Sequence, residues 1–160
     1  MRRFLFAAFT VTVLASCQPA TTELTVQQKG EMAAEVELVL DSFWDAWRAA
    51  DVDRGMSYYL NSPEMIWASG DQVVRGWTAV NDIAQAADIA SQAIILTESH
   101  TTVVALGVVH VMQRGSYSVT TLDGTTGPAF PCTVSSVWVR SDGEWKAQFV
   151  HVAQTLPEAA

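Results

Sequence analysis

The feature that most constrains the fold is the stretch from Ser135 to Gln154 near the end of the chain. Two runs rich in Val, Trp and Phe flank the dipeptide Asp142-Gly143. Two-residue β-hairpin turns favour Asp-Gly because both central positions adopt positive φ. We therefore predict a long antiparallel hairpin, against which the N-terminal part of the chain packs.

The length of this turn decides which side chains share a face of the hairpin. Because side chains alternate across the pleat, a two-residue turn gives one aromatic face that contains a histidine. The pairs expected on that face are Arg140–Trp145, Trp138–Ala147, Ser136–Phe149, Val134–His151 and Cys132–Ala153. The opposite face would carry Val137, Val139, Lys146, Gln148, Val150 and Val152. A three-residue loop with a bulge would shift the pairing by one residue, so this assignment is conditional.

Helical patterns occupy the first half of the chain. Thr25-Val26-Gln27-Gln28 fits a capping box, and apolar residues at a spacing of three to four predict an amphipathic helix from there to about Ala50. Asp51 is expected to cap a second helix, from Val52 to about Leu60. A third helix is expected from Trp77 to about Ala90.

Strand patterns dominate the remainder. A small hairpin is expected from Glu64–Ser69 and Gln72–Val74. Ala93–Thr97 and Thr102–Arg114 are predicted as strands joined through Ser99-His100-Thr101, with Gly107 marking a bulge or bend inside the second. Ser116–Thr121 continues or follows that strand. This order predicts an α+β fold in which three N-terminal helices pack on a strongly curved, mainly antiparallel sheet.

The chain of 160 residues has room for one domain with a proper core. Its formal net charge is −8, and Arg2 and Arg3 are the only charges in the first 22 residues. Without them, seven basic groups stand against seventeen acidic groups, a net charge of −10. So acidic a surface repels phosphate backbones, which argues against nucleic acid as a partner.

The N-terminus has the pattern of an export signal. Met1-Arg2-Arg3 precedes an apolar run, Phe4 to Leu14, that is too short to span a bilayer as a helix. The next residues, Leu14-Ala15-Ser16-Cys17, resemble the bacterial lipobox, which predicts a lipidated Cys17 and a membrane anchor. An ordinary secretory signal cut near Ser16 or Ala20 is the alternative.

We therefore expect a lipoprotein signal peptide at residues 1–16, a tether at 17–23, one domain at 24–155 and a tail at 156–160. The residue after the cysteine is Gln18 and not the Asp that favours retention in the inner membrane. The sequence therefore resembles the pattern of lipoproteins that are sorted to the periplasmic side of the outer membrane. With Cys17 lipidated, Cys132 has no disulfide partner in the chain.

Several marks in order along the chain resemble a known family. They are the long first helix that ends before Asp51, a Gly70…Gly76-Trp77 segment leading into a helix, and the Asp142-Gly143-Glu144-Trp145 turn with His151 six residues after the tryptophan. Over about residues 24–154 this order is similar to the nuclear transport factor 2-like (NTF2-like) superfamily, in its bacterial SnoaL-like branch.

The resemblance implies a cone, in which a curved sheet wraps around a long helix and encloses an apolar pocket open at one end. Relatives use this pocket as isomerases, dehydratases, polyketide cyclases or plain ligand binders, and many dimerise through the outer face of the sheet. A serine often stands two residues after the histidine of this pattern. Here Ala153 takes its place, which weakens the catalytic interpretation.

His151 is the candidate catalytic residue. Proton transfer in such a pocket needs a base of suitable pKa against an apolar wall, and the two-residue turn would place His151 on the aromatic face. A hydrogen-bonded histidine at the pocket rim is the alternative. His110, in mid-strand, is interpreted as a core or interface residue, and His100 as a solvated turn residue.

No residue pattern indicates a metal or a cofactor. The three histidines are dispersed and lack a carboxylate at ligand spacing, and no phosphate loop or dinucleotide fingerprint occurs. We expect neither a metal nor a cofactor. Cys132 has no activating cation near it in the sequence and is interpreted as an inert, buried thiol.

Aromatic residues predict an apolar ligand pocket. Six tryptophans are many for one small domain, and large aromatic side chains either fill a core or line a pocket for a flat, apolar molecule. The predicted pocket consists of Trp44, Trp47, Tyr59, Trp67, Trp138, Phe149 and His151.

Three functions are compatible with these observations. We favour a lipid-anchored module that binds a small apolar molecule without chemistry of its own. The alternatives are a cofactor-free acid-base enzyme of the isomerase, dehydratase or cyclase type with His151 as its base, and a structural dimerisation module whose pocket is filled by its own side chains. The outward valines of the hairpin would form an exposed patch unless covered, which predicts a homodimer through the sheet.

Overall fold

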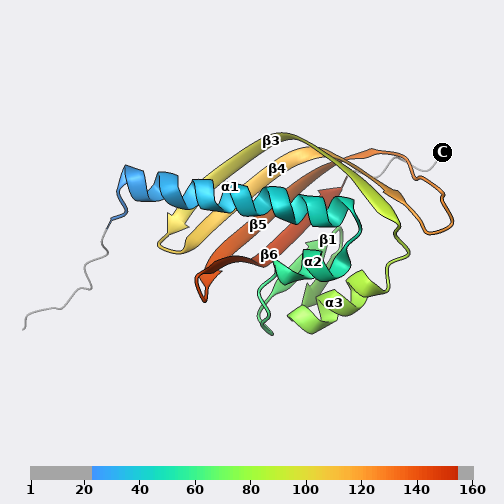
Figure 1. Cartoon of the computed structure of the whole chain (residues 1–160), viewed down its shortest axis with the longest axis horizontal. Coiled ribbons are helices and arrows are strands. Elements are labelled where there is room, and N and C mark those ends of the chain that lie inside the picture. Colours follow the sequence, from blue (N-terminus) through green and yellow to red (C-terminus); the bar gives the residue numbers. More distant parts are fainter. Residues whose placement is uncertain (1–22, 155–160) are drawn as a thin grey trace, which may run out of the picture.

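The computed structural model describes residues 23–154, in which a long helix crosses one face of a curved six-stranded sheet (Figure 1). The elements are α1 (Val26–Arg48), α2 (Val52–Ser57), β1 (Ile66–Ser69), β2 (Gln72–Arg75), α3 (Trp77–Gln85), β3 (Ser91–Ala105), β4 (Val108–Thr120), β5 (Phe130–Ser141) and β6 (Glu144–Gln154). The predicted α+β class, with N-terminal helices packed on a curved and mainly antiparallel sheet, is confirmed. The predicted signal peptide, the lipidated Cys17 and the tail at 156–160 lie outside the described residues.

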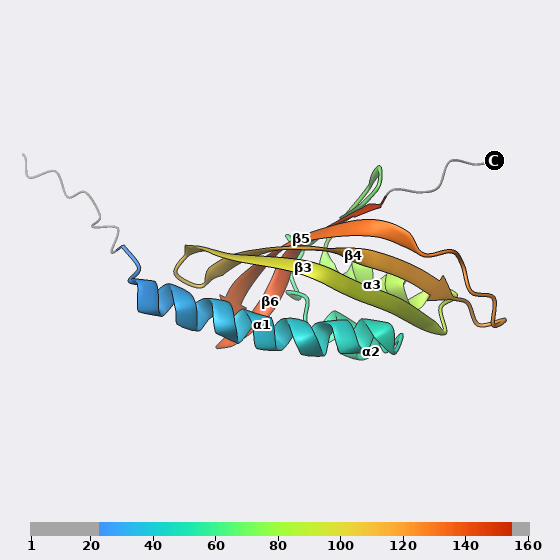
Figure 2. The ribbon, with the colours of Figure 1, turned by 90° about the horizontal axis from the view of Figure 1, so that it is seen from above.

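Helix α1 begins and packs as its sequence predicts. The Thr25 side chain accepts a hydrogen bond from the Gln28 backbone N–H, and the Gln28 side chain accepts one from the Thr25 N–H, which completes the capping box. Helix α1 runs along one face of the sheet (Figure 2), and its buried residues are Met32, Val36, Leu40, Phe43, Trp44 and Ala46. Phe43 meets the fully buried Trp138 edge to face, with ring centroids 5.5 Å apart. Such aromatic contacts add to the stability from apolar burial.

The two short helices lie near the C-terminal end of α1 (Figure 1). Asp51 caps α2 as predicted, since its carboxylate accepts a hydrogen bond from the Arg54 N–H. Trp77, the first residue of α3, donates its indole N–H to the Met56 carbonyl oxygen. The Gln85 side-chain amide at the end of α3 donates to the Asp53 carboxylate. These bonds hold α2 and α3 together.

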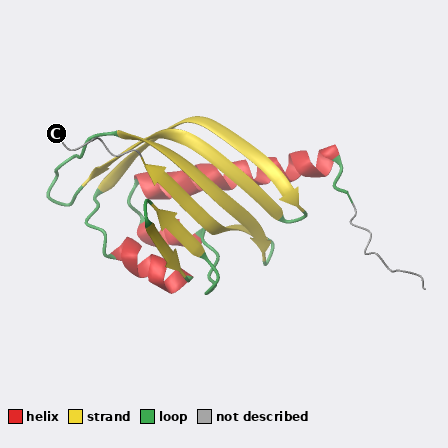
Figure 3. Ribbon diagram, turned by 180° about the vertical axis from the view of Figure 1, so that it is seen from behind, coloured by secondary structure: helices red, strands yellow, loops and turns green. Residues whose placement is uncertain are grey.

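The sheet has the strand order β2-β1-β6-β5-β4-β3. Every pair is antiparallel except β1 and β6, which run parallel where the small β1–β2 hairpin joins the four long strands (Figure 3). Within the described residues, no helix combines the length and the apolar character needed to cross a membrane.

The predicted break between two strands at Ser99-His100-Thr101 is wrong. β3 runs without interruption from Ser91 to Ala105, and the chain reverses at Leu106-Gly107. Gly107 adopts φ 71°, which a glycine allows at low cost, so it forms the turn and not a bulge within a strand. The polar residues at 97–100 resemble a turn in sequence because they lie on an exposed part of the strand.

The β5–β6 hairpin has the predicted two-residue turn, with positive φ at Asp142 and Gly143. The pairs Arg140–Trp145 and Trp138–Ala147 are confirmed. The register then shifts, because Gln148 is an extra residue in β6, so Val137 pairs with Phe149 and Ser135 with His151. The expected pairs Ser136–Phe149, Val134–His151 and Cys132–Ala153 are therefore wrong, and Val150 and Val152 face inward.

The bulge coincides with a change of neighbour along the edge of β6. Ala147 donates its backbone N–H to the Tyr58 carbonyl oxygen and accepts a hydrogen bond from the Leu60 N–H. From Phe149 onward, the same edge of β6 pairs with β1 instead. Gln148 stands between these two neighbours, which the hairpin sequence alone does not reveal.

Candidate functional site

A cavity of about 310 Å³ lies between the C-terminal half of α1, helix α3 and the inner face of the sheet. Its wall includes residues from every layer of the fold, among them Phe43, Trp44 and Trp47 from α1, Ile83 and Ala84 from α3, and Ile94, Tyr117, Val134, Val150 and Val152 from the strands. The volume lies at the lower end of the range for small-molecule sites.

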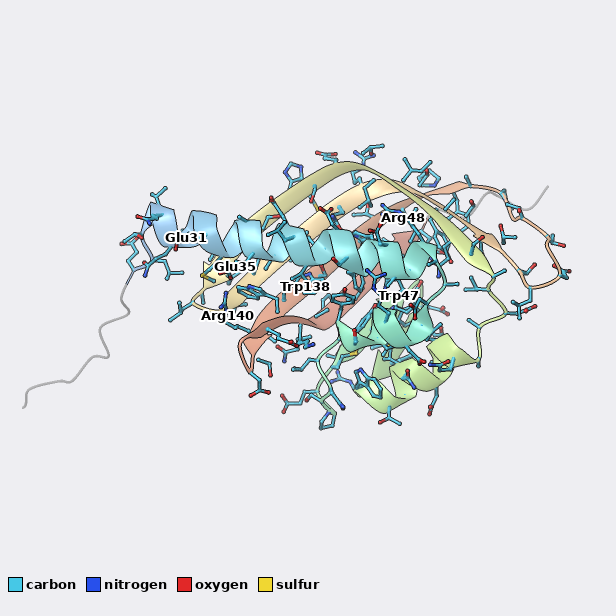
Figure 4. All side chains as sticks on the ribbon, viewed as in Figure 1. Glu31, Glu35, Trp47, Arg48, Trp138 and Arg140 are labelled. Atoms are coloured by element: carbon cyan, nitrogen blue, oxygen red, sulfur yellow. The ribbon has the colours of Figure 1, made fainter. Side chains whose placement is uncertain are left out.

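Trp47 is fixed by its neighbours. A Cβ added to Gly55 would lie 2.9 Å from Cε2 and 3.0 Å from Cζ2 of the Trp47 indole, so the glycine of α2 lets this ring pack closely. Tyr59 meets the same ring edge to face, at 6.1 Å between centroids. The indole N–H of Trp47 is buried and has no hydrogen-bond partner among the described residues. Figure 4 shows Trp47 near the end of α1, far from Glu35 and Arg140.

Trp44 is held by a buried polar contact. Its indole N–H donates to Oε1 of Gln113 over 2.9 Å, and the Gln113 side chain is buried on the inner face of β4. This hydrogen bond fixes the distance between α1 and the sheet. If the helix moved away, the buried indole N–H and the buried amide oxygen would both lose their partner.

The polar groups in the cavity wall are neutral. Burial raises the pKa of the Tyr59 hydroxyl well above its usual range. Burial, followed by the nearby Cys132, raises the pKa of Tyr117, and burial also raises the pKa of the Cys132 thiol. These three groups therefore stay protonated at neutral pH. The side-chain amides of Gln92 and Gln154 complete the polar part of the wall.

Among the described residues that line the cavity there is no Asp, Glu, His, Lys or Arg. A general base must reach its substrate and ionise near the working pH. The hydroxyls and the thiol in this wall are acids whose raised pKa values disfavour that role. The arrangement is suited to holding an uncharged molecule.

Four of the seven residues predicted for the pocket line this cavity, namely Trp44, Trp47, Tyr59 and Trp67. The other three lie elsewhere. Trp138 is fully buried in the core, where its indole N–H donates to the Ser136 hydroxyl. Phe149 and His151 lie on the outer face of the sheet, opposite the cavity, because of the bulge at Gln148.

The outer face therefore contains the histidine that was predicted to face the pocket. His151 pairs with Ser135, whose hydroxyl is 2.8 Å from Nε2 of His110. His100, on β3, is exposed and bonds Glu98, and this hydrogen bond is the main cause that lowers the pKa of the Glu98 carboxyl. Over residues 23–154, no three His, Cys, Asp or Glu side chains are grouped so that they could hold a metal ion.

The sequence interpretation missed most of the strand-derived wall. Gln92, Ile94 and Leu96 alternate along β3 and all line the cavity. Their period of two is visible in the sequence and could have identified them once the strand was assigned its full length. Val150 and Val152 could not be assigned to the inner face, because the bulge decides their orientation.

A cluster outside the cavity joins the first half of α1 to the β5–β6 hairpin. The Glu35 carboxylate accepts hydrogen bonds from the Arg140 guanidinium and, over 2.9 Å, from the Trp145 indole N–H. The Arg140 guanidinium also stacks 4.8 Å from the centre of the Trp145 ring. Figure 4 shows Glu35 and Arg140 near the start of α1.

Comparison with known proteins gives a consistent result. The family model of the SnoaL-like domain matches residues 36–156. No curated protein sequence matches this chain.

Solved structures agree in fold. A protein named as a candidate dehydratase of the NTF2-like family from Streptomyces avermitilis superposes with a TM-score of 0.69 at 18% identity, covering 80% of this chain and 99% of that one. An NTF2-like superfamily protein from Salmonella enterica serovar Typhimurium gives a TM-score of 0.70 at 15% identity, with coverage of 81% and 95%. The TM-scores establish a shared fold, whereas sequence identities this low leave the activity open.

Proposed function

Because the chain belongs to the family of SnoaL-like domains, we propose that it binds a small, uncharged, apolar molecule in the cavity beside Trp47, as a lipid-anchored protein of the bacterial cell envelope. The observation that supports this most is the composition of the cavity wall, which is aromatic and aliphatic with only neutral polar groups. An ionised ligand would lose its hydration there without gaining a partner of opposite charge, which is strongly unfavourable.

Tyr59, which lines the cavity, supplies one hydrogen-bond donor in this proposal. Its raised pKa keeps the hydroxyl protonated, and the backbone around it is fixed by the hydrogen bonds between Ala147 and the residues on either side of Tyr59. A ligand with one carbonyl or ether oxygen would accept a hydrogen bond from this hydroxyl while its apolar body fills the rest of the cavity.

We favour binding over catalysis. The Streptomyces avermitilis neighbour is named for a dehydratase activity, but at 18% identity that activity does not transfer to this chain. The alternative enzyme would need a base in the cavity. His151, the predicted base, lies on the opposite face of the sheet. The expected register that would have placed it on the aromatic face is not the one observed.

A homodimer through the outer sheet face remains part of the proposal. Met112, Val137, Val139 and Phe149 lie on that face at least partly exposed. Val150 and Val152, which the sequence predicts on this face, point inward, so the apolar area available to a partner is smaller than predicted. The purely structural alternative requires a filled pocket, and a cavity of about 310 Å³ argues against it.

Two matched dyes test the binding site. N-phenyl-1-naphthylamine is uncharged and 8-anilino-1-naphthalenesulfonate is a similar molecule with a charged sulfonate. We expect the uncharged dye to bind with enhanced fluorescence and the sulfonated dye to bind at least about tenfold more weakly, a difference of about 1.4 kcal/mol.

A matched pair of variants locates the dye. Ala84→Phe places a ring in the cavity wall and should abolish binding of the uncharged dye, whereas Ala86→Phe, at the exposed end of the same helix, should not. Equal binding of both dyes, or equal loss in both variants, would contradict the proposed site.

A further inference from the structure

The turn between β3 and β4 is an exposed apolar tip. Val104 is 63% exposed and Leu106 is 77% exposed. The whole segment Ser99–Gln113 contains no Asp, Glu, Lys or Arg, although the chain as a whole is strongly acidic. An exposed apolar loop on an otherwise charged protein is a candidate contact surface.

This tip, residues 104–107, is hydrogen-bonded to β5. Gly107 turns the chain with φ 71°, and its carbonyl oxygen accepts a 2.9 Å hydrogen bond from the Arg140 backbone N–H. Arg140 is itself bound to Glu35 of α1. Leu106 is therefore presented to solvent by an ordered turn that both the helix and β5 support.

The tip shares one end of the molecule with the start of α1, as Figures 1, 2 and 3 all show. Val26, the first residue of α1, is 89% exposed. Only six residue steps separate Cys17 from Glu23, the first described residue. Six steps of extended chain span at most about 21 Å, so a lipid on Cys17 would keep this end close to the bilayer.

The cavity lies toward the other end. Phe43 and Trp47, which line it, follow Val26 by 17 and 21 residues along α1. At about 1.5 Å per residue, this places them roughly 25–32 Å further along the helix axis. The loop between β4 and β5, which contains the 71% exposed Leu122, also lies at that end (Figure 1).

The geometry points to a defined orientation on the membrane. The tip at 104–107 docks, together with Val26, into the headgroup region of the bilayer that holds the Cys17 lipid, and the cavity lies on the side away from the membrane. The inference rests on the lipid anchor proposed above and not on the identity of the ligand. The tip itself contains no charged residue, so anionic lipids do not repel it. The ligand is then exchanged with the aqueous phase and does not enter sideways from the bilayer.

A polarity-sensitive fluorophore tests this orientation. The lipidated protein with Cys132→Ala receives a single new cysteine, Leu106→Cys at the tip or Leu122→Cys as the matched control of similar exposure. Each labelled protein is reconstituted into vesicles of phosphatidylethanolamine and phosphatidylglycerol. We expect emission from position 106 to shift to shorter wavelength and to be quenched by a lipid-attached quencher, while position 122 shows neither effect.

Each other outcome overturns the inference in a distinguishable way. An intact mass without an acyl group on Cys17 refutes the anchor and this inference together. Unchanged emission at position 106 in protein of acylated mass, or equal shifts at both positions, refutes the orientation and leaves the anchor standing. A shift at 106 that depends on protein concentration and not on lipid assigns the tip to a contact between protein molecules.

Discussion

Substituting Gly55 by alanine tests the packing that forms the cavity wall. The new Cβ would lie 2.9 Å from Cε2 of Trp47, closer than carbon atoms approach in folded proteins, and the indole cannot move freely because Phe43 and Tyr59 contact it. Overpacking of this kind costs about 1–3 kcal/mol. Alanine gains about 1 kcal/mol over glycine within a helix. We therefore expect Gly55→Ala to lower the free energy of unfolding by about 1 kcal/mol.

Gly30→Ala is the matched control. Gly30 lies in α1, and nothing lies within 4 Å of a Cβ added there. Only the higher helix propensity of alanine over glycine applies at this position, so this variant should be more stable than the wild type by about 1 kcal/mol. Urea unfolding of the three proteins, followed by tryptophan fluorescence, measures both changes. The packing argument is refuted if Gly55→Ala is as stable as Gly30→Ala.

Three further predictions concern other contacts. Gln113→Leu leaves the buried Trp44 indole N–H without its acceptor and should lower the free energy of unfolding by about 1–3 kcal/mol, whereas unchanged stability would show that the pair is not formed. Burial raises the pKa of Tyr59 in the folded state above the unfolded value of about 10. The protonated Tyr59 hydroxyl therefore contributes fully to the free energy of unfolding below pH 10, and this contribution is lost as the pH rises above 10. The wild type should therefore lose stability above pH 10 more steeply than Tyr59→Phe, and equal slopes in urea unfolding would contradict this. Glu35→Gln removes a half-exposed ion pair but keeps an acceptor for Trp145, so the loss in unfolding free energy should stay at or below about 1 kcal/mol.

Local sequence signals predicted the helix starts and the turn well, whereas α2 ends at Ser57 and not near Leu60, and α3 ends at Gln85 and not near Ala90. The capping box at Thr25–Gln28 and the cap at Asp51 depend on residues three positions apart, and both form as expected. Asp142-Gly143 likewise determines its own turn, because the positive φ values come from these two residues.

Tertiary contacts explain what the sequence did not reveal. The bulge at Gln148 depends on which segment pairs with the far edge of β6, and that partner lies about ninety residues earlier in the chain. A shift of one residue then moves His151 and Phe149 to the outer face and brings Val150 and Val152 into the core and cavity. Among the helices, the sequence therefore predicted wall residues only on α1, since Val80, Ile83 and Ala84 of α3 also line the cavity and were not named. On the strands the site was predicted only in part.

Native mass spectrometry of the protein purified from its own envelope tests the central claim most directly. We predict a chain that begins at an acylated Cys17 and retains one small, neutral molecule. This molecule should be absent from the Ala84→Phe variant and present in the Ala86→Phe variant. The claim of a binding cavity is contradicted if the wild-type protein retains no such molecule, or if Ala84→Phe retains it equally well.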